Sequence, residues 1–210
     1  MSNSTVKSLG VICVGFIVSA HFGCFSRQCW LNESTLPPLL GFRLGMSGEE
    51  LKQRFRGLQI KDLPYTELFF SGSETLPREQ DVSSRDEIGH VAVNTSRFPE
   101  FAEVSAVELK LENGHVSLIE VTYPDSSRWQ REDDFLIFVA QTLHLPDRRY
   151  WKSEQQARAG DGASITCNGL RVRAGFHLII GSAPAPGGPA PIAFPFVVVE
   201  DDNARQKLRR

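Results

Sequence analysis

The chain has 210 residues, of which 41% are hydrophobic and 23% charged, and its formal net charge is −2. That length is sufficient for one sizeable hydrophobic core, and the composition is that of a globular protein. A nearly neutral chain lacks the concentrated basic face that binds phosphate backbones, so we expect no nucleic-acid partner. The simplest organisation is a single domain preceded by an N-terminal segment.

The N-terminal segment, residues 1–25, is predicted to be a signal peptide or a membrane anchor. Residues 8–26 carry no charged side chain and include the apolar block 9–18. A block that is apolar on all sides is typical of a signal peptide, and small side chains before and at Ala20 suit cleavage after that residue. Two alternatives stay open. The uncharged run is nearly long enough to be retained as a membrane anchor. Residues 21–24 resemble a lipobox, which would make Cys24 the lipidated first residue.

The cysteines bear on the same question. Cys13 lies in the apolar block, which leaves Cys24, Cys29 and Cys167 as an odd number in an oxidising compartment. Lipidation of Cys24 would leave Cys29 to pair with Cys167, and closing so long a loop would stabilise the fold by about 4 to 5 kcal/mol in the chain-entropy model. The spacing leaves two alternatives open: all three cysteines unpaired, or Cys24 paired with Cys29.

Residues 26–40 contain Pro37-Pro38 and are predicted to form an extended tether. The domain is predicted over 41–202, followed by a basic tail at 203–210. A helix is expected from about Ser47 to Arg56, because Ser47 and Glu50 have the spacing of a capping box. Gly57 is a natural end for it.

The clearest β element is a hairpin. Residues 107–112 alternate between apolar and polar, Asn113-Gly114 suits a two-residue type I′ turn, and 115–123 form the return strand. The apolar pattern changes parity between Leu118 and Ile119, which indicates a bulge or burial on both faces. Residues 68–70 and 91–93 are further short strands, and 71–87 read as an exposed loop.

A second helix is predicted from near Ser127 to about His144, with an apolar stripe that packs on the sheet. Residues 165–172, 176–180 and 194–200 are predicted strands, and the Pro/Gly-rich stretch 182–191 is a projecting loop. The fold class is therefore α+β: an antiparallel sheet of about five to seven strands packed against two helices.

Catalytic signatures are missing from the sequence. No zinc-protease, nucleophile-elbow, phosphate-loop or Cys-x-x-Cys pattern occurs, and the five histidines are scattered. Acidic residues at 132–134 suit the start of a helix, so we predict no metal site there, and no cofactor. Trp129, Tyr150 and Trp151 are expected to complete the core. A small ligand under the loop 182–191 is a weaker hypothesis.

Residues 44–51, Leu-Gly-Met-Ser-Gly-Glu-Glu-Leu, resemble the Gly-Met-Thr/Ser-x-x-Glu-Val signature of small bacterial envelope lipoproteins of the SmpA/OmlA (BamE) family. They are also similar to the start of β-lactamase-inhibitor-like modules. The resemblance implies an α+β fold, a cell-envelope location and a non-enzymatic role in binding other proteins. It carries over only Gly45, Met46 and Ser47, as the turn into the helix.

These observations favour an exported or envelope-anchored protein that is structural or binds another protein, with an envelope protein as partner and the membrane contacted through the N-terminal segment. The alternative is an exported, hydrolase-like enzyme whose active site is assembled from distant parts of the sequence.

Overall fold

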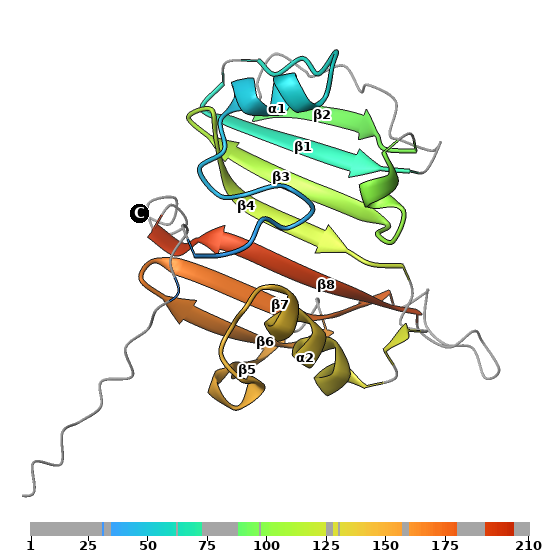
Figure 1. Cartoon of the computed structure of the whole chain (residues 1–210), viewed down its shortest axis with the longest axis vertical. Coiled ribbons are helices and arrows are strands. Elements are labelled where there is room, and N and C mark those ends of the chain that lie inside the picture. The colour runs from blue at the N-terminus through green and yellow to red at the C-terminus, as the bar shows by residue number, and fades with distance from the viewer. Residues whose placement is uncertain are drawn as a thin grey trace, which may run out of the picture.

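The computed structural model describes residues 31, 35–61, 63–72, 88–96, 98–124, 128–129, 131–156, 160–179 and 192–203. Within these residues the chain folds into one eight-stranded sheet with two α-helices and two 3-10 helices, labelled in Figure 1 where there is room. In chain order the elements are α1 (Gly48–Arg54), β1 (Tyr65–Ser71), β2 (Ile88–Asn94), η1 (Pro99–Phe101), β3 (Ala106–Glu112), β4 (His115–Thr122), α2 (Glu132–Thr142), η3 (Arg148–Tyr150), β5 (Lys152–Gln156), β6 (Gly160–Cys167), β7 (Leu170–Ile179) and β8 (Ile192–Asp201).

The predicted α+β class is confirmed, but the predicted sheet was too small. The strand order is β2-β1-β3-β4-β8-β7-β6-β5, so eight strands replace the predicted five to seven. The sheet is mostly antiparallel, with one exception that the sequence did not indicate: β1 pairs with β2 in parallel. The pairing of β4 with β8 joins the first half of the chain to the second.

One face of the sheet is covered, and the core lies on that side. Side chains alternate along each strand, and those on the covered face, such as Leu68, Leu109, Val121 and Val172, are fully buried. Helix α1 lies over the β1–β2 half and α2 over β7, as Figure 1 shows. Residues 35–47, which we call the arm, cross the same face between the two helices.

The capping box at the start of α1 is confirmed. The Glu50 backbone N–H donates to Ser47 Oγ at 3.2 Å, and the Ser47 backbone N–H donates to Glu50 Oε2 at 2.8 Å. The helix ends at Arg54, two residues before the predicted end, with Phe55 as its C-cap.

The arm is built into the core by an aromatic cluster. Phe42 is fully buried, and its ring centroid lies 5.3 Å from that of Phe70, 5.8 Å from Phe55 and 6.0 Å from Phe101. Leu31 and Leu39, which fall in the stretch predicted to be a tether, are also buried in the core. The described part of that stretch therefore belongs to the folded domain.

The predicted hairpin at 113–114 is confirmed. Asn113 and Gly114 have φ angles of 50° and 77°, the left-handed values that a type I′ turn requires. Of the two predicted causes of the parity change, a bulge is the one found, at Ser117 and so just before the predicted position. Leu111 pairs with Val116 and Lys110 with Leu118, so Ser117 is an extra residue in β4 and forms a bulge.

Helix α2 begins later than predicted. The expected start, Ser127, lies outside the described residues, but Arg131 has extended φ/ψ angles and the helix starts at Glu132. Trp129 lies in an aromatic cluster with Tyr123, at 5.3 Å, and Phe135, at 4.9 Å, and the extended Arg131 separates it from the first turn of α2.

The C-terminal strands were only partly predicted. Stretch 165–172 is divided by a second Asn-Gly turn, Asn168-Gly169, with φ angles of 48° and 80°. The expected strand at 176–180 continues β7, and β5 was missed. The Pro/Gly-rich stretch 182–191 lies outside the described residues.

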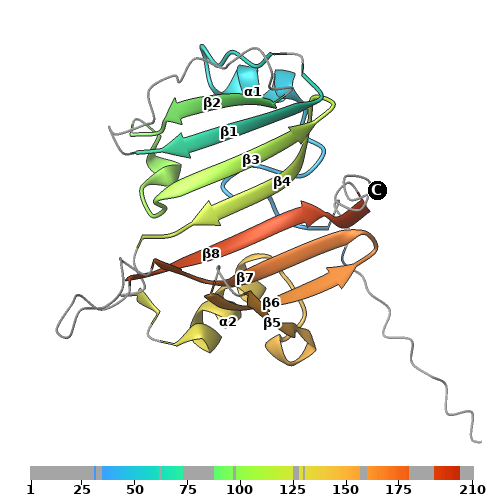
Figure 2. The ribbon, with the colours of Figure 1, turned by 180° about the vertical axis from the view of Figure 1, so that it is seen from behind.

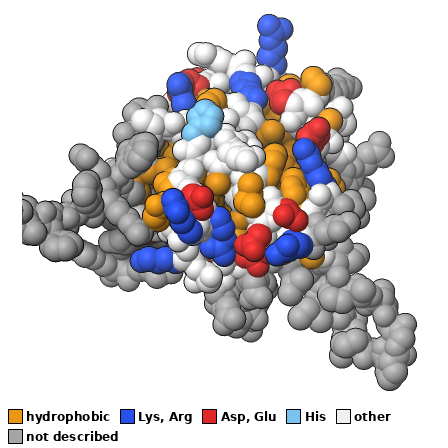
Figure 3. Space-filling model, turned by 60° about the horizontal axis from the view of Figure 1, so that its bottom comes forward, with side chains coloured by type: hydrophobic (Ala, Val, Ile, Leu, Met, Phe, Trp, Pro, Cys, Tyr) orange, Lys and Arg blue, Asp and Glu red, His pale blue; other side chains and the backbone are white. Residues whose placement is uncertain are grey.

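Figure 3 presents the end of the molecule formed by α2 and β5, where basic, acidic and hydrophobic side chains are interspersed. Of the side chains of α2 and the segment after it, Ile137 is 46% exposed and Tyr150 is 38% exposed. Asp133 lies 3.6 Å from Arg148. No side chain type dominates this end, so it offers no single-sign charged surface.

Candidate functional site

The face of the sheet opposite the helices is the candidate functional surface. Figure 2 views the molecule from this side, and no described helix crosses the strands there. We call this surface the open face. By register it carries Glu67 and Phe69 of β1, Glu108 and Lys110 of β3, Leu118 and Glu120 of β4, Phe196, Val198 and Glu200 of β8, Arg171, Arg173 and His177 of β7, Ser164 of β6 and Glu154 of β5.

A network of charged side chains links the last four strands of the open face. Arg171 donates to Glu154 at 2.5 Å and to Glu200 at 3.3 Å, so one guanidinium joins β5 to β8. Ser164 Oγ also donates to Glu154 at 2.5 Å, and Arg173 Nε lies 3.7 Å from Glu200. Two arginines therefore balance two glutamates in a partly buried cluster.

The network sets the protonation state of Glu154. Burial by itself would raise the pKa of this carboxyl, but the hydrogen bonds from Ser164 and Arg171 outweigh burial and lower it. A carboxylate with a lowered pKa is a weak base, and the Ser164 hydroxyl faces this carboxylate. The pair is therefore poorly suited to nucleophilic catalysis and well suited to fixing the positions of neighbouring side chains.

A second linkage crosses the centre of the open face. His177 Nε2 lies 3.1 Å from Glu120 Oε1, which connects β7 to β4 across β8. The His177 ring also stacks on Phe196, with centroids 4.0 Å apart. Although it belongs to the open face, Phe196 is only 5% exposed. The imidazole thus shields an aromatic ring and presents its own edge.

The other half of the open face combines an ion pair with an exposed aromatic ring. Lys110 Nζ lies 3.1 Å from Glu67 and 3.2 Å from Glu108. Burial acts to lower the pKa of Lys110, but the two carboxylates together raise it, so the ammonium stays charged. Phe69, on β1, is 38% exposed and is the large hydrophobic side chain most available to a partner here.

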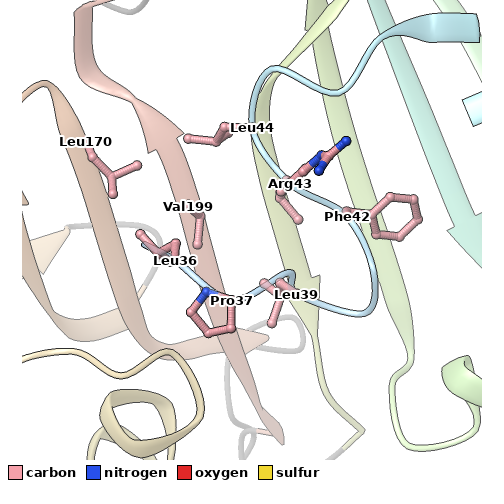
Figure 4. Close-up of a pocket in the computed structure, with 9 residues that line it drawn as sticks. Leu36, Pro37, Leu39, Phe42, Arg43, Leu44, Leu170 and Val199 are labelled. Carbon is pink, nitrogen blue, oxygen red and sulfur yellow. The ribbon is translucent and has the colours of Figure 1, made fainter. Parts of the chain in front are cut away.

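The structure also contains a small cavity on the covered face. Its volume is about 20 Å³, room for roughly one water molecule. As Figure 4 shows, the arm contributes Leu36, Leu39 and Leu44, and the strands contribute Leu170 and Val199. This is a packing gap beneath the arm, and it is too small for a metabolite.

The structure separates the residues that the sequence singled out. Gly45 and Met46 lead into α1, and their backbone N–H and C=O groups bond to Val116 of β4. Ser47 caps the helix and donates its hydroxyl to Glu50 at 3.0 Å. These three residues lead into α1, as expected, and the bonds to Val116 also attach the arm to the hairpin, which the sequence did not indicate.

The cysteines are only partly described. Cys167 is disulfide-bonded. Cys24 and Cys29 lie outside the described residues, so the pairing of Cys29 with Cys167 and the lipidation of Cys24 stay predictions. The Asn168 side chain, next to Cys167, donates to the Leu31 carbonyl at 3.1 Å. Since Cys29 is two residues before Leu31, at most about 7 Å of chain separates them.

The remaining candidates lie apart from one another. His115 and His144 are exposed at turns, Trp129 is in the core, and Trp151 is buried with its indole N–H donating to the Pro146 carbonyl. Tyr150 differs from the expectation, because it is exposed. No group of three metal-binding side chains occurs in the described part of the chain. None of the described helices is long and apolar enough to cross a bilayer; residues 8–26 lie outside that part.

Sequence reasoning missed the open face. Glu154, Arg171 and Glu200 are spread over 46 positions, and only strand pairing brings them together. The signal that was present is local: Arg171 and Arg173 alternate with the apolar residues Val172 and Ala174, as expected for a strand with one polar face. Comparison of the chain with family models, curated proteins and solved structures gave no match.

Proposed function

We propose that this protein is an exported or envelope-anchored, non-enzymatic module that binds another protein through the open face of its sheet. The observation that carries the proposal is the contrast between the two faces. One is covered by the arm and both α-helices, and the other has no described helix over it and displays Phe69, His177 and a set of paired charges.

The dimensions of the open face fit a protein partner. Eight strands at about 4.8 Å spacing give a width of about 34 Å, and about 20 Å of strand length gives roughly 700 Å². A standard protein interface covers about 800 Å² on each partner. A small molecule would instead need a concave pocket, and the described cavity is the size of one water.

The side chains of the open face are held in place before any partner arrives. Arg171 and Lys110 each contact two carboxylates, and His177 is held between Glu120 and Phe196. Ordering such long side chains costs about 0.5–1.5 kcal/mol each when it happens on binding. Because the sheet has already ordered them, that cost is reduced, which favours recognition of a specific partner.

Two observations support an exported location. The apolar run 8–26 is typical of targeting segments. Cys167 is disulfide-bonded, and disulfide bonds persist mainly in oxidising compartments such as the bacterial periplasm. The intact mass of the protein from the membrane and soluble fractions of its source cells tests this. Cleavage after Ala20, acylation at Cys24 or an uncut chain in the membrane fraction is expected, and an unmodified full-length mass in the cytosolic fraction alone would contradict export.

The binding proposal is tested with matched variants. Phe69→Asp places a charge on the open face, and Ile137→Asp places one on α2, at a similarly exposed hydrophobic position away from that face. Immobilised wild-type protein is incubated with envelope extract, and captured proteins are compared. We expect at least one protein to be retained by the wild type and by Ile137→Asp but lost with Phe69→Asp. Identical capture by all three would contradict binding through the open face.

A further inference from the structure

The negative charge of the open face is concentrated in the half formed by β1, β3 and β4. By register and burial, the charged side chains of this half are four glutamates and one lysine: Glu67, Glu108, Glu112, Glu120 and Lys110. They leave an excess of three negative charges, more than the formal net charge of −2 of the whole chain. A partner that covers this half takes the carboxylates out of water, so it must supply positive charge to pair with them.

Two of these carboxylates face each other directly. Glu108 of β3 pairs with Glu120 of β4, and side chains directly opposite on antiparallel strands have Cβ atoms about 5 Å apart. Each carboxylate has a contact of its own: Lys110 lies 3.2 Å from Glu108, and His177 lies 3.1 Å from Glu120. No lysine or arginine in the described part of the chain bridges the two carboxylates. Because like charges placed opposite each other repel, a cation from a partner is favoured between them.

An exposed aromatic ring lies in the same row of side chains. Phe69 of β1 is opposite Glu108, so Phe69, Glu108 and Glu120 stand on three adjacent strands, about 10 Å from first to last. On its other side Phe69 is opposite Ala92 of β2, which is exposed and adds only a methyl group. The Phe69 ring is 38% exposed, and the side chains of Glu108 and Glu120 are 33% and 24% exposed. All three are therefore accessible from the side of the sheet that Figure 2 shows.

We propose that the partner of the open face presents an arginine, whose guanidinium stacks on Phe69 and pairs with Glu108 and Glu120. This inference rests on the proposed function and adds the chemistry of the group that the open face recognises. An aromatic face attracts a cation, and a planar guanidinium offers N–H donors in a geometry that suits carboxylates. A lysine supplies the same charge, but its ammonium is a point charge without a plane that stacks on the ring. Arginine is also enriched among the residues that dominate protein interfaces.

Peptide titration of the full chain tests the recognition of arginine. The probe is acetyl-Ser-Thr-Arg-Thr-Ser-amide, and its control is the same peptide with citrulline, a neutral isostere of arginine. The isotope-labelled protein is titrated at low ionic strength, and the dissociation constant is obtained from the NMR shifts of its backbone amides. The same spectra show that each variant is folded.

Three variants are compared with the wild type. Glu108→Gln with Glu120→Gln removes the facing carboxylates, and Phe69→Leu keeps an apolar side chain but removes the aromatic face. Glu49→Gln with Glu103→Gln is the matched control. It removes the same charge from side chains that are 74% and 77% exposed and lie outside the strands of the sheet.

We expect the arginine peptide to shift the amides of β1, β3 and β4 and to bind about fivefold more tightly than the citrulline peptide. Removal of the facing carboxylates should weaken its binding by about fivefold, and Phe69→Leu by about threefold, whereas the matched control should bind as the wild type does. Equal affinity for the two peptides, shifts confined to other strands, or undiminished binding by the Glu108→Gln, Glu120→Gln variant would overturn the inference.

The capture experiment with envelope extract separates this inference from the proposed function. A protein that is lost with Phe69→Asp but retained by the Glu108→Gln, Glu120→Gln variant would overturn the arginine contact and leave binding through the open face intact. Identical capture by the wild type, Phe69→Asp and Ile137→Asp would contradict the proposed function, and this inference with it.

Discussion

The arm can be tested as a structural part of the domain by the substitution Phe42→Ala. Phe42 precedes α1 by six positions, in a segment without regular secondary structure, yet its side chain is fully buried. Its ring contacts Phe55, Phe70 and Phe101, and the Arg54 guanidinium lies 4.8 Å from the ring centroid. If the arm is part of the core, removing this ring must lower the free energy of unfolding substantially.

The magnitude follows from burial and the cavity left behind. Truncating a buried phenylalanine to alanine typically costs 3–5 kcal/mol, roughly. Three aromatic neighbours close around Phe42, so the site cannot collapse easily, and we expect a loss of about 4 kcal/mol. For a domain of this size, about 2–4 °C of Tm corresponds to each kcal/mol, so the Tm should fall by about 8–16 °C.

The measurement is urea unfolding followed by circular dichroism, with the free energy of unfolding obtained by linear extrapolation. Phe69→Ala is the matched control, because it removes the same ring from the open face, where it is 38% exposed. That control should cost about 1 kcal/mol or less. A loss below about 1 kcal/mol for Phe42→Ala, or equal losses for both variants, would refute the integration of the arm into the core.

Four further predictions concern single sites. Ser47→Ala removes the helix cap and should lower the free energy of unfolding by about 1 kcal/mol in the same urea assay, whereas no change would show that the cap is dispensable. Gly114→Ala places a Cβ on a residue with left-handed backbone, at φ 77°, and should lower the free energy of unfolding by about 1–2 kcal/mol, measured by thermal unfolding. The loss comes from backbone strain, because no atom lies within 4 Å of the added carbon. An unchanged stability would argue against the type I′ turn. The pKa of Glu154 is lowered in the folded state, so the stability that its carboxylate contributes is present above the ordinary glutamate pKa of about 4.3 and is lost as the pH falls through the lowered pKa. The difference in unfolding free energy between the wild type and Glu154→Gln should therefore become smaller in acid. A constant difference from pH 7 to pH 3 would contradict the network. Burial raises the pKa of Tyr123 to about 12, so its phenol should ionise at a higher pH than an ordinary tyrosine in an absorbance titration at 295 nm. The free energy of unfolding should fall as the pH rises above about 10, the ordinary tyrosine pKa. Titration of all three tyrosines of the folded protein near pH 10 would contradict this burial.

Elements with local causes could be predicted from the sequence. The cap at Ser47 and Glu50 needs residues three positions apart, and the Asn113-Gly114 turn needs two adjacent residues that tolerate positive φ. The bulge in β4 was visible as a parity change, because a single extra residue shifts every later side chain to the other face. These features depend on short-range sterics and hydrogen bonds, and the sequence therefore determined them.

Elements that depend on contacts between distant residues could not be predicted. Helix α2 starts at Glu132, and Trp129 before it packs on Tyr123, the residue after β4, and on Phe135 of α2, contacts that depend on the folded chain. The parallel strand β2 and the strand β5 form the two edges of the sheet, and the sequence pattern did not indicate either pairing. The same holds for the candidate site: Glu154, Arg171 and Glu200 become neighbours only when β5 to β8 pair in register.

By itself, then, the sequence determined an α+β domain with a capped first helix, a type I′ hairpin and a near-neutral charge, since each follows from local chemistry or composition. Only the tertiary structure decided that the arm belongs to the core, that the eight described strands form one sheet, and that both described α-helices lie on one face. The physical reason is that burying apolar surface is non-directional and acts between residues far apart in the chain. Burial of apolar surface thus selects which face of the sheet the arm and the α-helices cover, and which face no described helix covers.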